Sequence, residues 1–310
     1  TGLRTFRCGS ATCNGGGDTP GRLRSQTSEA LHERRHEARV ARVLVSKRVE
    51  RVVPQQHGAS GRAQQQKRRG VQQQDARQEI HLETYIFQYD ATGARIAAAL
   101  KRAAQRGVAV HLLIDGFGSH GLSRIVIQEM LAAGVQVLIY RQEFFSFRFK
   151  RYRLRRMHRK LAVMDASVAF VGGINIIDDC SEPDASFPRF DYAVQVAGPL
   201  LAEIHAAARH LWMLAAWVYF KKRWTNRSPV MASRLPAGHQ RASLVIRDNL
   251  RNRHSIERCY LRSIAAARRE IILANAYFLP GKHFRQALAR AAQRGVSVIL
   301  LLQGKSEYRL

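Results

Sequence analysis

The sequence contains one strand–helix–strand pattern twice, and this repeat restricts the possible folds more than any other feature. The stretch "LARAAQRGVSVILLLQG" (288–304) matches "LKRAAQRGVAVHLLIDG" (100–116) at most positions. Ahead of these stretches, "REIILANAYFLP" (269–280) parallels "RQEIHLETYIFQ" (77–88). Self-similarity of this kind predicts two copies of one structural unit. We therefore expect a chain built from two similar halves.

The order of elements in the first copy predicts an α/β fold. Apolar runs at 80–87 and 108–116 read as buried strands, and 93–107 between them reads as an amphipathic helix. A second helix at 123–134 and a third strand at 135–140 follow. Alternating strands and helices of these lengths are typical of a layered α/β fold with largely parallel pairing.

The first part of the chain differs in composition from the rest. It holds glutamine clusters at Gln64–Gln66 and Gln72–Gln74 and many arginines, with little apolar periodicity. We expect residues 1–78 to be a disordered basic segment, or a stretch read in a shifted frame. The first half then spans 79–225, and 226–310 is the start of a second half that is truncated.

The charge of the chain points to an anionic partner. Its 310 residues carry a formal net charge of +28, because 51 Lys and Arg residues stand against 23 Asp and Glu residues. Nucleic acid and an acidic membrane surface both suit this charge. A simpler alternative is a genome-wide bias towards arginine at ordinary surface positions.

The sequence also excludes several classes of protein. It has no apolar run of about 18 residues, so we expect no transmembrane helix, and its first residues do not resemble a secretory signal. Its four cysteines lack paired spacing, which argues against a zinc site or a disulfide framework and fits a reducing cytoplasm.

The stretch "MHRKLAVMD" (157–165) is the candidate site. If it is a strand, alternation puts His158 and Lys160 on one face and Asp165 on the other. Asp165 is then a poor direct partner for His158 and a better structural residue. The glycine pair Gly172–Gly173 follows, then Asn175.

This set of residues suits phosphodiester chemistry. An imidazole can attack phosphorus and form a covalent intermediate. Lys160 and the amide of Asn175 can stabilise charge on the non-bridging oxygens, a role that otherwise needs a metal. A second histidine would have to protonate the departing alkoxide. An H-x-K pair alone would be read as an ordinary surface strand.

The full string H-x-K-x4-D-x6-G-G-x-N, from His158 to Asn175, resembles the motif of the phospholipase D superfamily. Several other stretches look like the bacterial cardiolipin synthases of the B type: "LETYIF", "LLIDGFGS", "RMHRKLAVMD", "FVGGIN", "DYAV" followed by "GPL", and "ANAYFLPG". The resemblance runs from about residue 79 to 310. It implies a phospholipase D-like α/β fold of two similar halves, each a mixed central β-sheet flanked by helices, with the second half incomplete.

The resemblance also implies roles for individual residues. The motif makes His158, Lys160 and Asp165 the candidate catalytic residues, with His158 as nucleophile or general acid. Gly173 and Asn175 would support or bind the phosphate. The carboxylate that orients the histidine would be Asp191, in "FDYAV", more plausibly than Asp165.

The implied reaction moves a phosphatidyl group from one phosphatidylglycerol to the hydroxyl of another, so that cardiolipin forms and glycerol leaves. Phosphatidylethanolamine is an alternative donor. The resemblance implies no metal and no other cofactor. The implied partners are anionic phospholipids at the cytoplasmic face of the bacterial membrane, with peripheral attachment and no obligate protein partner.

The chain departs from the family pattern in holding one motif. The helix-ending glycines Gly107 and Gly295 are 188 positions apart (295 − 107), which places the counterpart of His158 near position 346 (158 + 188). We expect either a fragment of a two-motif enzyme or a site completed by two paired chains. The alternatives are a single-motif nuclease that acts as a homodimer, and an inactive fragment that binds anionic surfaces.

Secondary features remain open. The segment 141–160 mixes basic and aromatic residues, which suits lipid headgroups better than nucleic-acid bases given the family resemblance. The segment 198–224 predicts a long helix, either at the membrane boundary or in the core. We expect His205 and His210 to be structural. Asp115 ends a strand where α/β sites form, or simply in a turn.

Overall fold

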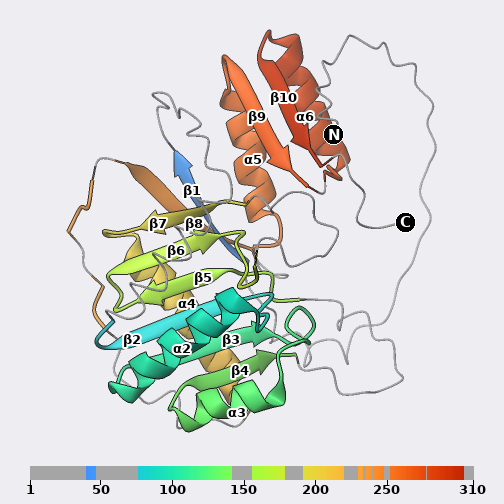
Figure 1. The fold of residues 1–310 in the computed structure, drawn as a ribbon. Helices are drawn as coiled ribbons and strands as arrows, with labels where there is room; N and C mark the ends of the chain where they lie inside the picture. Colours follow the sequence, from blue (N-terminus) through green and yellow to red (C-terminus); the bar gives the residue numbers. More distant parts are fainter. Residues whose placement is uncertain are drawn as a thin grey trace, which may run out of the picture. The chain divides into compact units, whose positions relative to one another are not determined.

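The computed structural model of this protein describes residues 40–46, 76–141, 156–178, 191–219, 230–232, 235–238, 240–247, 252–276 and 278–303. The chain divides into two compact units (Figure 1). The described residues of one unit lie within Arg34–Asn252, and those of the other lie within Arg253–Leu310. Each unit is described by itself.

The larger unit is built on a six-stranded sheet with the order β4-β3-β2-β5-β6-β7. Its strands are β2 (Glu79–Thr84), β3 (Ala109–Asp115), β4 (Gln136–Tyr140), β5 (Leu161–Met164), β6 (Val168–Gly172) and β7 (Ala193–Val196). The strands β2, β3 and β4 pair in parallel, whereas β5, β6 and β7 continue the sheet with antiparallel pairs. The sheet is therefore mixed, as the family resemblance implies. Only its first three strands have the parallel pairing that the alternating helices predict.

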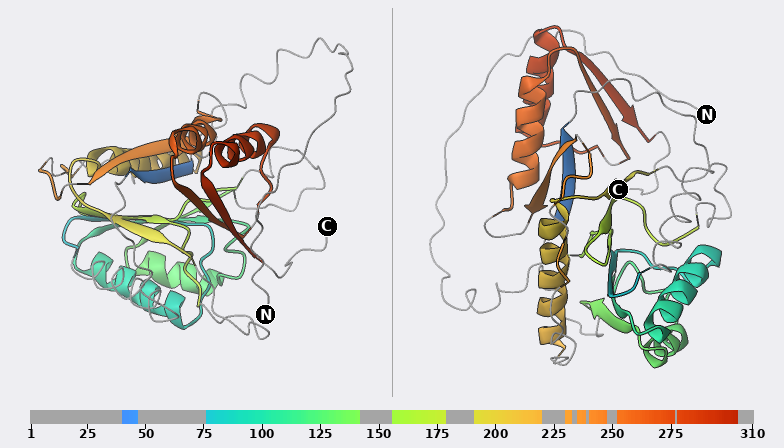
Figure 2. Two further views of the ribbon diagram at one scale, coloured as in Figure 1. Left: turned by 90° about the horizontal axis from the view of Figure 1, so that it is seen from above. Right: turned by 90° about the vertical axis from the view of Figure 1, so that its left-hand side faces the viewer.

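Helices cover both faces of this sheet (Figures 1 and 2). On one face lie α2 (Ala91–Gln105) and α3 (Arg124–Ala132), which are the crossovers between the parallel strands. The Asp90 side chain caps α2 by accepting a hydrogen bond from the N–H of Gly93 at 2.9 Å. On the other face lies α4 (Leu201–Val218).

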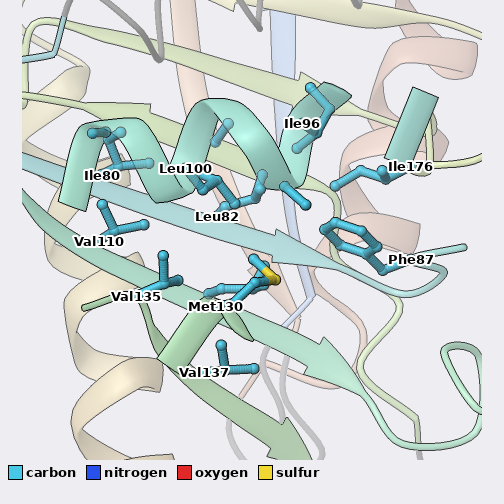
Figure 3. Close-up of a cluster of buried hydrophobic side chains, with 14 of the residues drawn as sticks. Ile80, Leu82, Phe87, Ile96, Leu100, Val110, Met130, Val135, Val137 and Ile176 are labelled. Carbon is cyan, nitrogen blue, oxygen red and sulfur yellow. The ribbon is translucent and has the colours of Figure 1, made fainter. Parts of the chain in front are cut away.

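The apolar core between the sheet and α2 and α3 comes from alternate strand residues (Figure 3). Ile80 and Leu82 of β2 point into this core, where they meet Leu100 of α2, Val110 of β3 and Met130 of α3. Replacing a core leucine such as Leu100 by alanine is expected to destabilise the fold by about 2–5 kcal/mol.

The intervening residues of β2 are polar and face α4. Glu79, His81 and Glu83 are buried on this side. Strand alternation therefore gives β2 one apolar face and one charged face. The charged face positions the site described below.

The helix α4 is shorter than the predicted segment 198–224. It ends at Val218, and the rest of that segment beyond Tyr219 lies outside the described residues. Trp212 is buried against the sheet, whereas Trp217 is 59% exposed. Most of α4 is thus a core helix, one of the two alternatives for this segment. Among the described helices, none combines the length and the apolar character that crossing a membrane requires.

The larger unit also contains a strand that we did not expect. Residues Val40–Ser46 form β1, which pairs antiparallel with β8 (Arg241–Arg247). Three of these seven residues are valine, a β-branched residue that strands favour. Disorder was predicted for all of 1–78, so β1 departs from that prediction. The other residues before Ala76 lie outside the described part of the chain.

The smaller unit repeats the strand–helix–strand pattern of the first. Its elements are α5 (Ser255–Ala266), β9 (Glu270–Asn275), α6 (Lys282–Gln293) and β10 (Ser297–Leu302). The strands β9 and β10 pair in parallel across α6, as β2 and β3 do across α2. The sequence repeat therefore corresponds to a structural repeat.

Candidate active site

The candidate histidine lies just before β5. Residues 158–165 were predicted to be a strand, but regular pairing covers only Leu161–Met164. His158 is nevertheless exposed between the buried Met157 and Arg159, whereas Lys160 is itself buried. His158 is therefore an accessible side chain between two buried neighbours.

His158 and Lys160 meet at one aromatic ring. The imidazole of His158 lies 4.9 Å from the ring of Tyr85, centroid to centroid, and Lys160 Nζ lies 5.0 Å from the same centroid. The predicted shared face of His158 and Lys160 is thus present. Tyr85 was not named as a site residue, although it lies in the stretch "LETYIF" that carries part of the family resemblance.

A buried aspartate anchors the backbone on one side of His158. Asp115 is completely buried, and its Oδ2 accepts a hydrogen bond from the N–H of Met157 at 2.7 Å. Its Oδ1 accepts hydrogen bonds from the N–H groups of Phe117 at 3.0 Å and Gly118 at 3.2 Å. Asp115 therefore shapes the turn after β3 and also ties that turn to the segment that carries His158.

A buried ion pair anchors the other side. Arg159 Nε lies 2.7 Å from Glu83 Oε2, and the two side chains are 1% and 3% exposed. Burial raises the pKa of Glu83 to about 7, although the positive charge of Arg159 acts in the opposite direction. A carboxylate in a buried strand signals a buried partner, but the sequence alone does not say that this partner is Arg159.

The glycine pair allows a close approach. A Cβ atom at Gly173 would lie only 2.1 Å from Asp191 Oδ1, so no other residue fits beside this carboxylate without movement. The N–H of Gly173 donates to the carbonyl oxygen of Tyr192 at 2.8 Å. Gly173 and Asp191, both predicted site residues, are therefore neighbours.

The Asn175 side chain contacts the segment that carries Tyr85. Its Oδ1 accepts a hydrogen bond from the N–H of Ile86 at 3.1 Å. One residue further on, Phe87 and Ile176 form an isolated parallel bridge. The loop after β6 is thus fastened to the loop after β2, next to the ring on which His158 and Lys160 rest.

Asp165 sits at the other end of β5 from His158. Its carboxylate accepts hydrogen bonds from the N–H groups of Arg77 at 2.8 Å, Gln78 at 2.9 Å and Glu79 at 2.9 Å. Its φ of 47° lies in the left-handed region, as required in the turn between β5 and β6. Asp165 therefore fastens this turn to the start of β2.

One group of described residues has the side chains to hold a metal ion. Glu79, His81 and His205 offer ligand atoms that all lie within 4.8 Å of one another. His205 was predicted to be structural, and it makes an ion-pair contact with Glu79. The cluster lies beneath α4 and is separate from the surface around His158.

The basic aromatic segment 141–160 can be followed only at its ends, since 142–155 lie outside the described residues. At its described end, the guanidinium of Arg156 lies 4.6 Å from the ring centroid of Phe117. This cation–π contact places a positive charge beside the turn that Asp115 shapes.

This chain is similar to known proteins in both sequence and fold. Residues 71–182 match the family described as "Cardiolipin synthase, PLD-like domain", where PLD stands for phospholipase D. The chain is 40% identical over 233 residues to cardiolipin synthase B of Escherichia coli strain K12, covering 75% of this chain and 56% of that protein. It is 27% identical over 238 residues to cardiolipin synthase 1 of Bacillus cereus, covering 76% and 47%. The chain thus spans about half the length of the curated relatives it matches.

Among solved structures, the phosphatidylserine synthase of Haemophilus influenzae Rd KW20 matches with a TM-score of 0.50. The match covers 88% of this chain and 64% of that chain at 10% identity, so it shows a shared fold alone. These findings confirm the family resemblance that the motif around His158 indicates. Residues 71–182 belong to the phospholipase D-like domains of the cardiolipin synthase type.

Proposed function

We propose that the protein is a phosphatidyltransferase of the cardiolipin synthase type. It transfers a phosphatidyl group from one phosphatidylglycerol to a hydroxyl of a second one. The proposal is supported by the family of residues 71–182 and by the 40% identity to cardiolipin synthase B. The observation that carries it is the exposed His158 beside Lys160 on the ring of Tyr85, with both neighbours of the histidine anchored.

The proposed reaction has two displacements. In the first, an imidazole nitrogen attacks phosphorus, a P–N bond forms, and glycerol leaves as an alkoxide that takes a proton from a general acid. In the second, the general acid, now deprotonated, takes the proton of an acceptor-lipid hydroxyl, whose oxygen attacks phosphorus, and the P–N bond breaks. The products are cardiolipin and glycerol. His158 acts as the nucleophile, or as the general acid if the two histidines exchange roles.

The residues around His158 stabilise the charge on the phosphate and orient the imidazole. Lys160 and the amide of Asn175 bind the non-bridging phosphate oxygens, where negative charge grows in the transition state. Asp191, which lies against Gly173, orients the imidazole. In this proposal Asp165 acts through the fold and not on the substrate.

The second histidine comes, in this proposal, from a second H-x-K motif. The repeat spacing of 188 places it near position 346. The presence of the β9–α6–β10 unit supports a two-motif enzyme, because a single-motif enzyme does not need it.

We further propose that the protein works at the cytoplasmic face of the membrane as a peripheral protein. A net charge of +28 favours contact with anionic lipids. Phosphatidylglycerol supplies both the substrate and this negative surface, with phosphatidylethanolamine as an alternative donor. No cofactor and no obligate protein partner enter the proposal.

A nuclease is the second candidate, since the same charge also suits nucleic acid. In that case the single motif would work in a homodimer. The test is to express the gene in a bacterial host that lacks cardiolipin synthases and to measure its lipids by mass spectrometry. Cardiolipin is expected to appear. DNA cleavage by the purified protein without any cardiolipin in the host would favour the nuclease.

A further inference from the structure

A polar cluster lies between the central sheet and α4, apart from the surface around His158. Glu79 and His81 come from the α4-facing side of β2, and His205 comes from α4 itself. Their exposed fractions are 6%, 3% and 4%, so all three side chains are removed from water. Apolar clusters flank them, one around Leu113 and Trp212 and the other around Val163 and Leu201.

The three side chains converge through their polar atoms. His205 Nε2 contacts Glu79 Oε1, and His81 Nε2 lies 3.5 Å from Glu79 Oε2. Despite these contacts, Glu79 Oε1, His81 Nε2 and His205 Nε2 make no hydrogen bond of good geometry within the described residues. A buried polar atom without a hydrogen bond destabilises the folded state, because it has lost its contacts with water. A ligand common to all three atoms would remove this cost.

The donor set identifies the class of ligand. Two imidazole nitrogens and one carboxylate oxygen form a set that zinc and related divalent metals prefer. Such a metal binds the deprotonated carboxylate and the neutral imidazoles, and the three donor atoms lie within 4.8 Å of one another.

The surroundings hold the ligands in place. The ring of His111 stacks on His81 at 4.5 Å between centroids and lies 4.7 Å from the ring of Trp212. This stack limits rotation of the His81 ring. Arg209 lies one turn after His205 on α4, and its positive charge acts on His81, so it opposes a cation. The ionised Glu79 offsets this repulsion.

We propose that Glu79, His81 and His205 bind one zinc-class divalent metal ion, with water completing the coordination. The site joins a central strand to the helix that covers it, so its role is to fasten α4 to the sheet. No step of the proposed phosphatidyl transfer passes through the ion. The site is therefore independent of the proposed function and can be tested without any activity assay.

The first experiment uses the whole 310-residue chain without a histidine tag. The protein is stripped with a chelator and titrated with Zn²⁺ and, separately, with Co²⁺. We expect one ion to bind per chain, and bound Co²⁺ to show the visible absorption bands of an ion with a low coordination number. Zn²⁺ should raise the thermal unfolding temperature, because the ion binds the folded state. No uptake by the wild-type chain, or no change in unfolding temperature, would overturn the proposal.

Variants locate the site. His205→Ala is expected to weaken Zn²⁺ binding by at least about tenfold. Mutating residues that only hydrogen-bond to metal ligands already lowers metal affinity by about this much. The matched control is His283→Ala, which removes an exposed imidazole outside the cluster and is expected to leave binding unchanged. Unchanged binding by a folded His205→Ala chain would contradict the site. If that variant does not fold, as judged by circular dichroism, the stoichiometry and Co²⁺ spectrum of the wild-type chain decide.

Discussion

Arg159 and Glu83 form an ion pair with 2.7 Å between Nε and Oε2, buried directly beside the exposed His158. The pair joins the segment before β5 to β2, the neighbouring strand. Together with the hydrogen bond from Met157 to Asp115, it holds both neighbours of His158 while the imidazole itself remains accessible. Orientation of this kind matters because small displacements of a reacting group lower rates strongly.

Breaking this pair from one side should cost stability. At a pH well above the Glu83 pKa of about 7, where the carboxylate is ionised, Glu83→Gln leaves the Arg159 guanidinium buried without its partner, and we expect a loss of about 3–5 kcal/mol in the free energy of unfolding. Urea denaturation of the variant and the wild type measures the difference. A loss below about 1 kcal/mol would contradict the role of the pair.

Replacing both partners separates stability from positioning. The double variant Glu83→Leu with Arg159→Met is expected to regain most of the lost stability, because it removes the unpaired buried charge. In a protein that includes the second motif, its rate of phosphatidyl transfer should stay well below that of the wild type at unchanged KM, since the anchor of His158 is still absent. Full recovery of the rate together with stability would show a merely structural pair.

Asp115 provides a second test of the anchoring. Asp115→Ala leaves the N–H groups of Met157, Phe117 and Gly118 without their acceptor. Because hydrogen bonds to a charged group are worth about 1.5–3 kcal/mol, we expect a loss of at least this size in unfolding free energy. Asp115→Asn keeps one acceptor oxygen and should be milder. Equal stability of the alanine variant and the wild type would argue against the anchor.

Gly173 tests the approach of Asp191. In Gly173→Ala the new Cβ would lie 2.1 Å from Asp191 Oδ1, so the carboxylate must move. We expect transfer activity to fall by at least about tenfold, with the loss in kcat. Gly121→Ala is the matched control, because a Cβ there meets no atom within 4 Å. Equal activities of the two variants would show that the position of Asp191 is unimportant.

Asp165 is expected to matter for folding more than for chemistry. An asparagine at position 165 can adopt the positive φ, but its side chain accepts the hydrogen bonds from the three backbone N–H groups less well. Asp165→Asn should therefore lower the free energy of unfolding by about 1–3 kcal/mol. The rate per folded molecule should remain close to that of the wild type. An unchanged melting temperature with lost turnover would contradict this assignment.

Much of the fold could be predicted from sequence periodicity. The elements from β2 to β4, with the helices α2 and α3, lie within a few residues of their predicted ranges. Apolar residues at strand and helix spacing report directly on burial. The predicted strand at 158–165 was too long, since the residues before Leu161 are held by side-chain anchors and not by regular pairing. The strand β1 was missed because its partner β8 is far away in sequence.

The site was predictable only in part. The motif indicates His158, Lys160, Gly173 and Asn175, because the spacing of those residues is itself the signal. The contacts of Tyr85, Glu83 and Asp115 could not be read, since they depend on which strands become neighbours in the sheet. The cluster of Glu79, His81 and His205 needs both the alternation of β2 and the docking of α4, and no local pattern contains the second.

The most direct measurement uses a complete protein that includes the second motif, and compares its cardiolipin formation with that of its His158→Ala variant in a host without cardiolipin synthases. His283→Ala, which removes an exposed imidazole, is the control for loss of a histidine. We predict cardiolipin with the wild type and with His283→Ala, and none with His158→Ala at an equal level of folded protein. Normal cardiolipin formation by the folded His158→Ala variant would contradict the central claim that this histidine takes part in the transfer.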